Sequence, residues 1–373
     1  METNYLIIGG GMTGDAAVKG IREHDADGRI VLVGAESHPP YKRPPLSKGL
    51  WSGGDEAKVW KNTEEHGAEL VLGRRIVSLD PQAKRAVDDE GDEYAFDKVL
   101  LATGGTPRRL PGENVDHVVY FRTLDDFRKL HGIAGEGKRI TVVGGGFIGS
   151  ELAAALTGAG AKVTMLFPED GLAWRVLPAD LSHFVTGYYR DKGVDVRTGE
   201  SIASTDDIDA DIVVAGLGIV PNVELAESAG LPVDNGIVVD EYGRVAGDVF
   251  AAGDVANYPS IPLGKRFRVE HEDHANTHGK VVGANMAGAN QVYDHIPFFY
   301  SDMFDLGYEA VGEVDSRLAT VETWQEPNRK GTIAYVDDDG RPRGFLMWNV
   351  WDKVDQAREL ILAGEPVGEG AVV

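Results

Sequence analysis

The sequence of 373 residues contains no cysteine. Catalysis through a redox-active cysteine pair is therefore excluded, and with it the reductases that act on thioredoxin, glutathione or coenzyme A disulfides. Cysteine-based peroxidases and oxidases are excluded for the same reason. If the protein transfers electrons, they must leave from a bound cofactor.

Positive charge is scarce as well. The chain has 37 basic and 60 acidic side chains, for a formal net charge of −23. Nucleic acids and anionic membranes need a cationic footprint, so we expect neither as a partner. No apolar run is long enough to span a bilayer. The first residues lead directly into an apolar strand pattern, so we expect no signal or transit peptide and a cytoplasmic location.

Glycine is abundant, and two glycine patterns of the same design are present. Residues 7–14 read Ile-Ile-Gly-Gly-Gly-Met-Thr-Gly, and residues 142–149 read Val-Val-Gly-Gly-Gly-Phe-Ile-Gly. Each follows a short apolar run and precedes an alanine-rich stretch, as in the strand, turn and helix of a dinucleotide-binding unit. Glycine-rich turns also occur in α/β folds that bind no nucleotide. Here the pattern occurs twice, and each copy is followed at a similar spacing by an acidic residue. The pair therefore predicts two bound dinucleotides.

The three spaced glycines of each fingerprint have separate roles. They are Gly9, Gly11 and Gly14 in the first copy and Gly144, Gly146 and Gly149 in the second. The first allows a tight turn, the second lets backbone N–H groups approach a pyrophosphate, and the third lets helix and strand pack closely. About 20 residues further on, Glu36 and Glu169 end the second strands and are expected to bind ribose hydroxyls.

The order of the remaining apolar strands predicts the fold class. Strands over 98–102, 211–215 and 249–252 end in the small-residue turns Thr103-Gly104, Gly216 to Gly218, and Gly253-Asp254. This order predicts an α/β protein with two Rossmann-like dinucleotide-binding domains, the second inserted in the first, and a small α+β C-terminal domain. The expected segments are 1–115 and 221–295 for the FAD-binding domain, 116–220 for the NADH-binding domain, and 296–373 for the C-terminal domain.

Two further regions have a local interpretation. Residues 37–48 contain four prolines and predict an ordered loop rather than a helix or strand. The tail predicts strands at 309–314, 318–323, 331–336 and 343–348, with a hairpin turn at 337–340 and a final helix over 351–363.

These features resemble the FAD-dependent pyridine nucleotide oxidoreductases, in the group that holds ferredoxin and rubredoxin reductases. The loop Tyr-Lys-Arg-Pro-Pro-Leu-Ser-Lys at 41–48 resembles the flavin-side loop of that group. Within the group, the closest resemblance is to the apoptosis-inducing factors. It is carried by residues 144–153, 269–275, 307–312 and 346–350. The acidic composition argues against a DNA-binding activity here.

The resemblance implies FAD in the first nucleotide domain and NADH in the second. It places Arg43 on the pyrophosphate, Asp254 on the ribityl chain and Arg122 on FAD; the alternative for Arg43 is a solvated loop arginine. Lys48 and Glu151 resemble an ion pair beside the flavin ring, where the lysine stabilises charge formed as hydride arrives. For Glu151 the alternative is simple stabilisation of a helix N-terminus.

Residues 270–278 allow two interpretations. At helical spacing His271, His274 and His278 share one face and are candidate metal ligands. We prefer the other interpretation, without a metal, in which the helix N-terminus faces the flavin pyrimidine and Glu270 and His271 line the ring.

Two aromatic residues and the second acid concern the nicotinamide. By resemblance, Phe147 gates or stacks on the nicotinamide, and Tyr300 stands where relatives have a tryptophan facing the flavin; ordinary core packing is the alternative for both. Glu169 predicts NADH over NADPH, because a carboxylate accepts the ribose 2′-OH but repels a 2′-phosphate.

We therefore expect an FAD-dependent NADH oxidoreductase that passes electrons to an external acceptor. The acceptor is either a small carrier protein of the ferredoxin or rubredoxin type, or a quinone or oxygen. The alternative hypothesis is a redox-sensing interaction protein with slow turnover, in which NADH controls homodimerisation.

Overall fold

The computed structural model describes residues 1–112 and 117–372, which divide into two compact units. The first comprises Met1–Lys42, Ala57–Thr106 and Val220–Pro297, and the second Arg43–Glu56, Pro107–Ile219 and Phe298–Val373. The predicted boundary at residues 115 and 116 lies outside the described residues, and the four-segment division stays a prediction.

The first unit is built on a sheet whose central strands are parallel. Its order is β15-β16-β6-β1-β2-β3, with β4 and β5 joined antiparallel beside β6. β16 (Val249–Ala251) follows the second fingerprint in sequence, yet it pairs in parallel with β6 (Glu93–Leu101), Val249 opposite Val99. The chain therefore returns to the first sheet after the second fingerprint, as the predicted insertion requires.

The other elements of this unit include two long helices. Its strands are β1 (Glu2–Ile8), β2 (Ile30–Gly34), β3 (Ala68–Leu72), β4 (Ile76–Asp80), β5 (Arg85–Asp88), β14 (Ile237–Val238), β15 (Arg244–Ala246), β17 (Ala256–Ser260) and β18 (Lys265–Phe267). Its helices are α1 (Met12–Arg22), α5 (Glu224–Ser228) and α6 (Glu272–Met286), with 3-10 helices η4 (Thr63–His66) and η6 (Gly253–Val255). The elements η3 (Glu56–Val59), β7 (Gly105–Pro107) and β13 (Ile219–Pro221) span the places where the chain passes between units.

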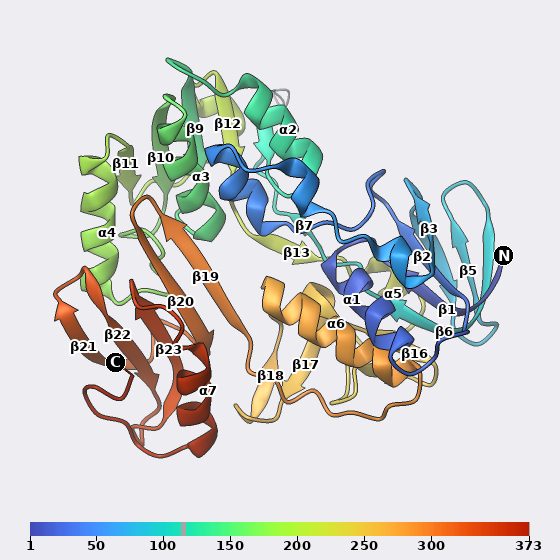
Figure 1. Cartoon of the computed structure of the whole chain (residues 1–373). Helices are drawn as coiled ribbons and strands as arrows, with labels where there is room; N and C mark the ends of the chain where they lie inside the picture. The colour runs from blue at the N-terminus through green and yellow to red at the C-terminus, as the bar shows by residue number, and fades with distance from the viewer. Residues whose placement is uncertain (113–116, 373) are drawn as a thin grey trace. The chain divides into compact units, whose positions relative to one another are not determined.

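Alternation along β1 sends side chains to two cores. Ile7 packs with Leu32, Ala17 and Val282 on the face covered by α1 and α6. Leu6 and Ile8 belong to the opposite face, with Tyr258 and residues of β4 and α5. Such runs, apolar on both faces, are typical of parallel strands covered on both sides. α1 and α6 lie side by side (Figure 1).

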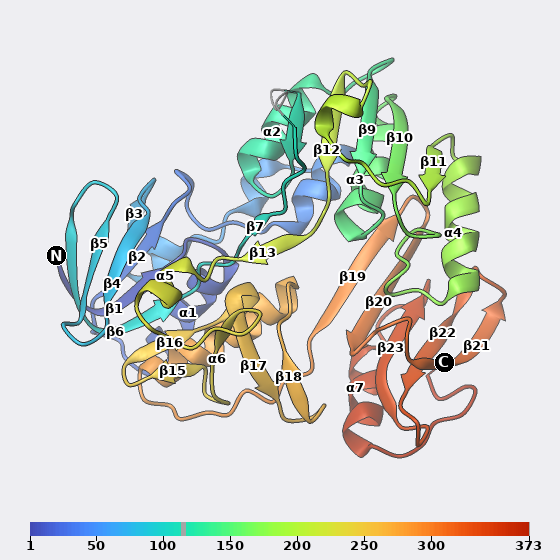
Figure 2. The same ribbon diagram turned by 180° about the vertical axis from the view of Figure 1, so that it is seen from behind.

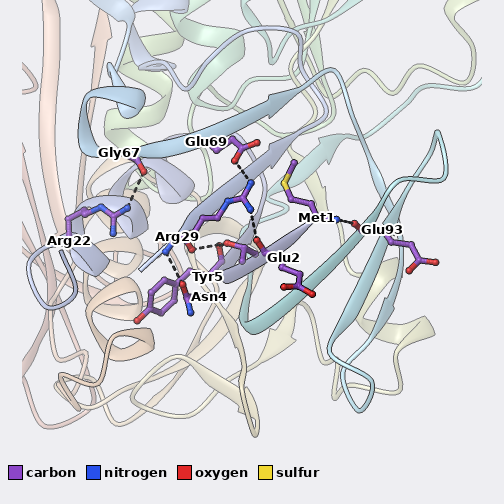
Figure 3. A network of polar contacts seen from close by, with 10 residues as sticks. Met1, Glu2, Asn4, Tyr5, Arg22, Arg29, Gly67, Glu69 and Glu93 are labelled. Atoms are coloured by element: carbon purple, nitrogen blue, oxygen red, sulfur yellow. Dashed lines mark hydrogen bonds and ion pairs between the residues drawn. The ribbon is translucent and has the colours of Figure 1, made fainter. Parts of the chain in front are cut away.

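The amino-terminal ends of these strands are tied by polar contacts (Figure 3). Arg29 Nη1 donates to the Glu2 carbonyl at 2.8 Å, and Arg29 Nη2 pairs with Glu69 at 2.7 Å. The Met1 amino group donates to the Glu93 carbonyl at 2.5 Å. These contacts join β1 to the strands around it, at the end of the sheet remote from the first fingerprint.

The second unit contains a five-stranded sheet in the order β11-β10-β9-β12-β8, all parallel. The strands are β8 (Val118–Tyr120), β9 (Arg139–Val143), β10 (Lys162–Phe167), β11 (Asp195–Thr198) and β12 (Ile212–Ala215). The helices are α2 (Leu124–Ile133), α3 (Phe147–Gly158) and α4 (Ala179–Asp191), with 3-10 helices η1 (Pro44–Ser47), η2 (Gly49–Ser52) and η5 (Thr205–Asp207). The proline-rich loop therefore contains a short helix at Pro44–Ser47, contrary to the prediction.

The same unit holds an antiparallel sheet in the order β19-β20-β23-β22-β21 (Figure 2). Its strands are β19 (Phe298–Met303), β20 (Leu306–Gly312), β21 (Ala319–Glu326), β22 (Lys330–Val336) and β23 (Pro342–Trp348), and α7 (Val354–Ala363) packs against β20 and β23. The hairpin at 337–340 is confirmed: Asp337 N–H donates to the Arg341 carbonyl at 3.0 Å. The sequence prediction missed β19.

Each fingerprint follows the strand at which the strand order of its sheet reverses. β1 lies between β2 and β6, and β9 lies between β10 and β12. Ligands of parallel α/β sheets bind beyond the carboxyl ends of strands at such switch points. In the described residues, 1–112 and 117–372, no helix is long and apolar enough to cross a membrane.

Candidate functional site

The first fingerprint has the geometry of a phosphate cradle. Gly9 has φ +131°, and a Cβ there would lie 2.1 Å from the Ala102 oxygen. A Cβ at Gly14 would lie 2.2 Å from the Gly9 oxygen, whereas at Gly11 it would meet nothing within 4 Å. The outer glycines are therefore required by packing, and the middle one leaves backbone open for a ligand. This geometry fits the pyrophosphate of a dinucleotide.

The second fingerprint repeats this geometry. Gly144 has φ +114° and a Cβ there would lie 2.4 Å from the Gly216 oxygen; at Gly149 it would lie 2.0 Å from the Gly144 oxygen. A Cβ at Gly146 would again meet nothing within 4 Å. Gly11 and Gly146 are the N-cap residues of α1 and α3, and neither helix has a side-chain cap. Each helix start can therefore offer backbone N–H groups to an anion.

The two ribose-binding candidates differ in how they are held. The Tyr41 hydroxyl donates to Glu36 Oε2 at 2.6 Å, and Tyr41 is buried against Trp60. Glu169 instead pairs with Arg175 Nη2 at 3.4 Å, and the Arg175 side chain is 88% exposed. Arg175, six residues beyond Glu169, was not among the predicted residues.

The small-residue turns after the apolar strands are held by hydrogen bonds that involve backbone groups. Thr103 Oγ1 donates to the Asn222 carbonyl at 2.8 Å, and Asn222 N–H donates to the Gly104 carbonyl at 3.0 Å. Gly218, with φ +74°, accepts from the Arg108 N–H at 3.0 Å. Asn222 was not among the predicted residues.

Two arginines predicted to contact FAD lie together in the second unit. Arg43 Nη1 donates to the Arg122 carbonyl at 2.9 Å. The Arg122 N–H in turn donates to Asp126, which also closes the capping box at the start of α2. Both arginines are half-buried. The contact of Arg43 with the pyrophosphate and that of Arg122 with FAD stay predictions.

Glu151, the fifth residue of α3, is the centre of a buried polar cluster. It accepts hydrogen bonds from Ser47 Oγ at 2.6 Å and from Ser301 Oγ at 2.7 Å, and it pairs with the Lys48 ammonium. Ser47 and Lys48 come from the proline-rich loop, and Ser301 from β19. This arrangement exceeds what stabilisation of a helix end would need. It holds a lysine charge in a fixed place, as the ion-pair prediction for Lys48 and Glu151 requires.

The Tyr300 ring lies next to this ion pair. Lys48 Nζ lies 4.8 Å from the Tyr300 ring centroid and 3.4 Å from Asp302 Oδ2. Phe147 contacts Phe299, with ring centroids 5.1 Å apart. Phe147 therefore packs against the rings of Phe299 and Tyr308, and its role at the nicotinamide stays a prediction.

A second group of predicted residues belongs to the first unit. His271 is the N-cap residue of α6, and Arg268 pairs with Glu270 at 2.7 Å. Arg268 Nη1 also donates to the Asp254 carbonyl at 3.1 Å. Burial lowers the pKa of His271 to about 4, and the charges of Asp254 and Asp273 act in the opposite direction. His271 is therefore neutral at pH 7. Lys48, Glu151 and Tyr300 belong to the other unit.

The metal interpretation of the three histidines finds no support. Among the residues that the structure describes, no group of three or more His, Asp or Glu side chains could hold a metal ion. His274 and His278 instead lie inside an aromatic cluster with Tyr258 and Tyr293.

A buried acid that the sequence analysis missed links three elements of the first unit. Asp15, fully buried on α1, pairs with Lys19 at 2.9 Å and with Lys61 at 3.3 Å, and it accepts from Thr63 Oγ1 at 2.8 Å. Lys61 also donates to Asn276 on α6 at 3.0 Å. An acid in a first helical turn is common, and nothing local in the sequence marks this one as buried.

Comparison with known proteins decides the family. The model of the pyridine nucleotide-disulphide oxidoreductases matches residues 3–279. The chain belongs to this family. A second model, "apoptosis-inducing factor, mitochondrion-associated, C-term", matches residues 282–331. The family's FAD and NADH fit the two cradles, and the class of the protein as an NAD(H)-dependent flavoprotein oxidoreductase is confirmed.

Individual relatives cover almost the whole chain. Mitochondrial apoptosis-inducing factor 1 of Dictyostelium discoideum is 34% identical over 97% of this chain and 78% of its own length. The ferredoxin–NAD(+) reductase component of the anthranilate 1,2-dioxygenase system of Burkholderia cepacia is 34% identical over 96% and 94%. The structure of the covalent putidaredoxin reductase–putidaredoxin complex is similar with a TM-score of 0.91 and 28% identity, over 98% of this chain and 94% of that one.

Proposed function

We propose that the protein is an NADH-dependent reductase of a small ferredoxin-type iron–sulfur carrier. One NADH and two oxidised carriers give one NAD⁺, one proton and two reduced carriers, so that hydride enters as an electron pair and leaves as single electrons. Bound FAD supplies the ability to accept a hydride and release electrons singly. A cytoplasmic location belongs to the same proposal.

The observation that carries this proposal is the buried Lys48–Glu151 pair in a chain without cysteine. The lysine charge is held by Glu151, while Ser47 and Ser301 donate hydrogen bonds to the carboxylate at 2.6 and 2.7 Å. Such a fixed positive charge stabilises negative charge that develops beside it. Without cysteine, no thiol pair of this chain can receive the electrons. Relatives whose names describe ferredoxin reductases support a one-electron carrier as the acceptor.

We assign the two cradles by their acids. Glu36, fixed by the buried Tyr41, suits a cofactor that stays bound, and Glu169 suits a coenzyme that exchanges. Arg43, Arg122 and Asp254 would hold FAD, and Phe147 would lie beside the nicotinamide. His271, neutral at pH 7, would face the flavin site without adding charge to it.

The test begins with the purified protein and its flavin spectrum. Stopped-flow reduction by NADH is followed by reoxidation with a [2Fe–2S] ferredoxin, a rubredoxin, a quinone and oxygen. We expect the ferredoxin to reoxidise the protein fastest. A colourless protein that binds no added FAD, or reoxidation by oxygen or quinone that equals the ferredoxin rate, would overturn the proposal.

The dependence of the reoxidation rate on ionic strength provides a second test. The net charge of −23 repels an acidic carrier at long range, and salt screens that repulsion. Raising the ionic strength should therefore speed reoxidation by an acidic ferredoxin and leave reoxidation by neutral oxygen unchanged. Size-exclusion chromatography with and without NADH examines the redox-sensing alternative, which requires a change in oligomeric state and slow turnover with every carrier.

A further inference from the structure

The Gly253–Asp254 turn, which follows β16, has no conformational freedom at its first residue. Gly253 has φ +74°, and a Cβ there would lie 2.1 Å from Thr13 Oγ1 on α1. The residue is buried, so its backbone groups have little access to water. The backbone at Gly253 is therefore held in one conformation by its neighbours.

The N–H of Gly253 needs an acceptor from outside the turn. It is the first N–H of the 3-10 helix η6, and the N-cap residue Ala252 has no side chain that could accept from it. Buried donors at a helix start are costly when they are left unpaired. Gly253 N–H donates to Nδ1 of His278 at 3.3 Å. His278, which belongs to α6, thus accepts a hydrogen bond from the first N–H of η6, as a capping side chain would.

The position of His278 is fixed because α6 packs directly against the backbone of α1. A Cβ at Gly279 would lie 2.5 Å from the Thr13 oxygen, and at Gly283 it would lie 2.2 Å from the Ala17 oxygen. In the other direction, a Cβ at Gly20 would lie 2.0 Å from the Lys280 oxygen. These contacts leave α6 no room to slide along α1, so the imidazole is presented to Gly253 in one place.

The protonation state of His278 follows from the same contact. A ring nitrogen that accepts from a main-chain N–H carries no proton, so neutral His278 is protonated at Nε2. The ring is fully buried between Tyr258 and Tyr293, with centroids 5.3 and 4.5 Å away. Burial lowers the pKa of His278 to about 3. The imidazole therefore stays neutral and remains an acceptor across the working range of pH.

We propose that His278 is a positioning residue of the FAD site, which holds the Gly253 N–H and so fixes the backbone that carries Asp254. This inference rests on the proposed function, in which Asp254 binds the ribityl chain. Arg268 holds the Asp254 carbonyl at 3.1 Å, so the Gly253–Asp254 peptide unit lies between a held N–H on Gly253 and a held carbonyl on Asp254. Loss of the His278 contact would free the Gly253 N–H and would leave the Asp254 carbonyl held by Arg268.

The test compares two substitutions at His278. In His278→Asn the amide oxygen lies close to the place of Nδ1 and can still accept, whereas His278→Leu has no acceptor. Val282→Ala, one turn further along α6 in the core, is the control for general loss of stability. The readouts are FAD affinity of the FAD-free protein, the visible spectrum and midpoint potential of the bound flavin, and hydrogen exchange of peptides covering 249–258.

We expect His278→Leu to weaken FAD binding by about tenfold and to speed exchange in 249–258, because a buried donor loses its acceptor. His278→Asn should restore both, and Val282→Ala should lower the melting temperature without changing FAD affinity. Wild-type affinity and exchange in His278→Leu would overturn the proposal. So would equal losses in the Asn and Leu variants, or in Val282→Ala.

Two further outcomes separate this proposal from the one on which it rests. If the wild-type protein binds no FAD, the proposed function fails, yet exchange in the FAD-free protein still tests the contact between His278 and Gly253. If His278→Leu does not fold, His278→Gln takes its place, because its polar atoms lie near Nε2 and cannot reach the Gly253 N–H. We expect it to behave as the Leu variant should, and wild-type FAD affinity in it would overturn the proposal.

Discussion

Removing both partners of the Lys48–Glu151 pair should destabilise the protein far less than the sum of the two single removals. The two side chains are 12% and 5% exposed, so solvent screens their interaction little. A buried charge that loses its partner typically costs about 3–5 kcal/mol. In Glu151→Leu, Lys48 keeps Asp302 at 3.4 Å, and in Lys48→Met, Glu151 keeps its two serine donors. These remaining contacts place each single variant near the lower limit, at about 3 kcal/mol.

The double variant Lys48→Met/Glu151→Leu removes both charges of the buried pair, and the remaining Asp302 carboxylate is 54% exposed. We expect its cost to fall below the sum of the two single costs by about 3 kcal/mol. The assay is urea unfolding of the FAD-free protein, because a bound cofactor would add its own stabilisation to every variant. The matched control is the exposed pair of Arg128 and Glu56, 2.5 Å apart with side chains 42% and 36% exposed.

The control pair should show a coupling of no more than about 1 kcal/mol, since exposed ion pairs contribute little. The reasoning is refuted if the Lys48 and Glu151 costs add to within about 0.5 kcal/mol, which is the behaviour of independent sites. It is equally refuted if the exposed pair couples as strongly as the buried one.

Three further predictions concern coenzyme choice, acid stability and FAD retention. The wild-type kcat/KM should favour NADH over NADPH, and Glu169→Ala should remove most of that preference while the neighbouring Asp170→Asn retains it; an NADPH preference in the wild type would contradict the role of Glu169. Because the pKa of His278 falls from 6.5 to about 3 on folding, the unfolded state binds the proton first as the pH drops. Stability is therefore lost between pH 6.5 and 3, and urea unfolding at pH 7 and 5 should show a loss about 2 kcal/mol smaller in His278→Asn than in the wild type. Tyr41→Phe should weaken FAD binding about tenfold by freeing the Glu36 carboxylate, measured by titration of the FAD-free protein, and should leave the KM for NADH unchanged.

The sequence predicts those parts of the fold whose signal is local. The glycine fingerprints, the apolar strands and the hairpin at 337–340 depend on a few consecutive residues, and the structure has them near the predicted bounds. The missed strand β19 has no such signal. It turns into β20 at Phe304, which has φ +60° without being glycine or asparagine, so the rules for turn residues do not find it.

The candidate site is predicted only in part for a similar reason. Lys48 and Glu151 were paired by resemblance to a family, but the two serines that donate to Glu151 are far from it in sequence. Ser301 lies in none of the motifs, and the motif at 41–48 did not mark Ser47 as a donor to Glu151. Arg175 lies six residues beyond Glu169, on a segment that returns to the fingerprint through an N–H of Ala173 donating to the Gly145 carbonyl at 2.8 Å. Only the folded chain brings such residues together, and periodicity contains no information about them.

The two cradles share their glycine geometry, so their glycines cannot decide which nucleotide each one holds. The acids can, because they differ in preorganisation. Glu36 is fixed by a short hydrogen bond from a tyrosine that is itself 2% exposed, so little side-chain entropy remains to be lost when a ribose binds. Glu169 instead has a long contact with the exposed Arg175, and binding must order both side chains. The first arrangement favours slow release and the second favours exchange, which is the division of labour that a resident FAD and a passing NADH require.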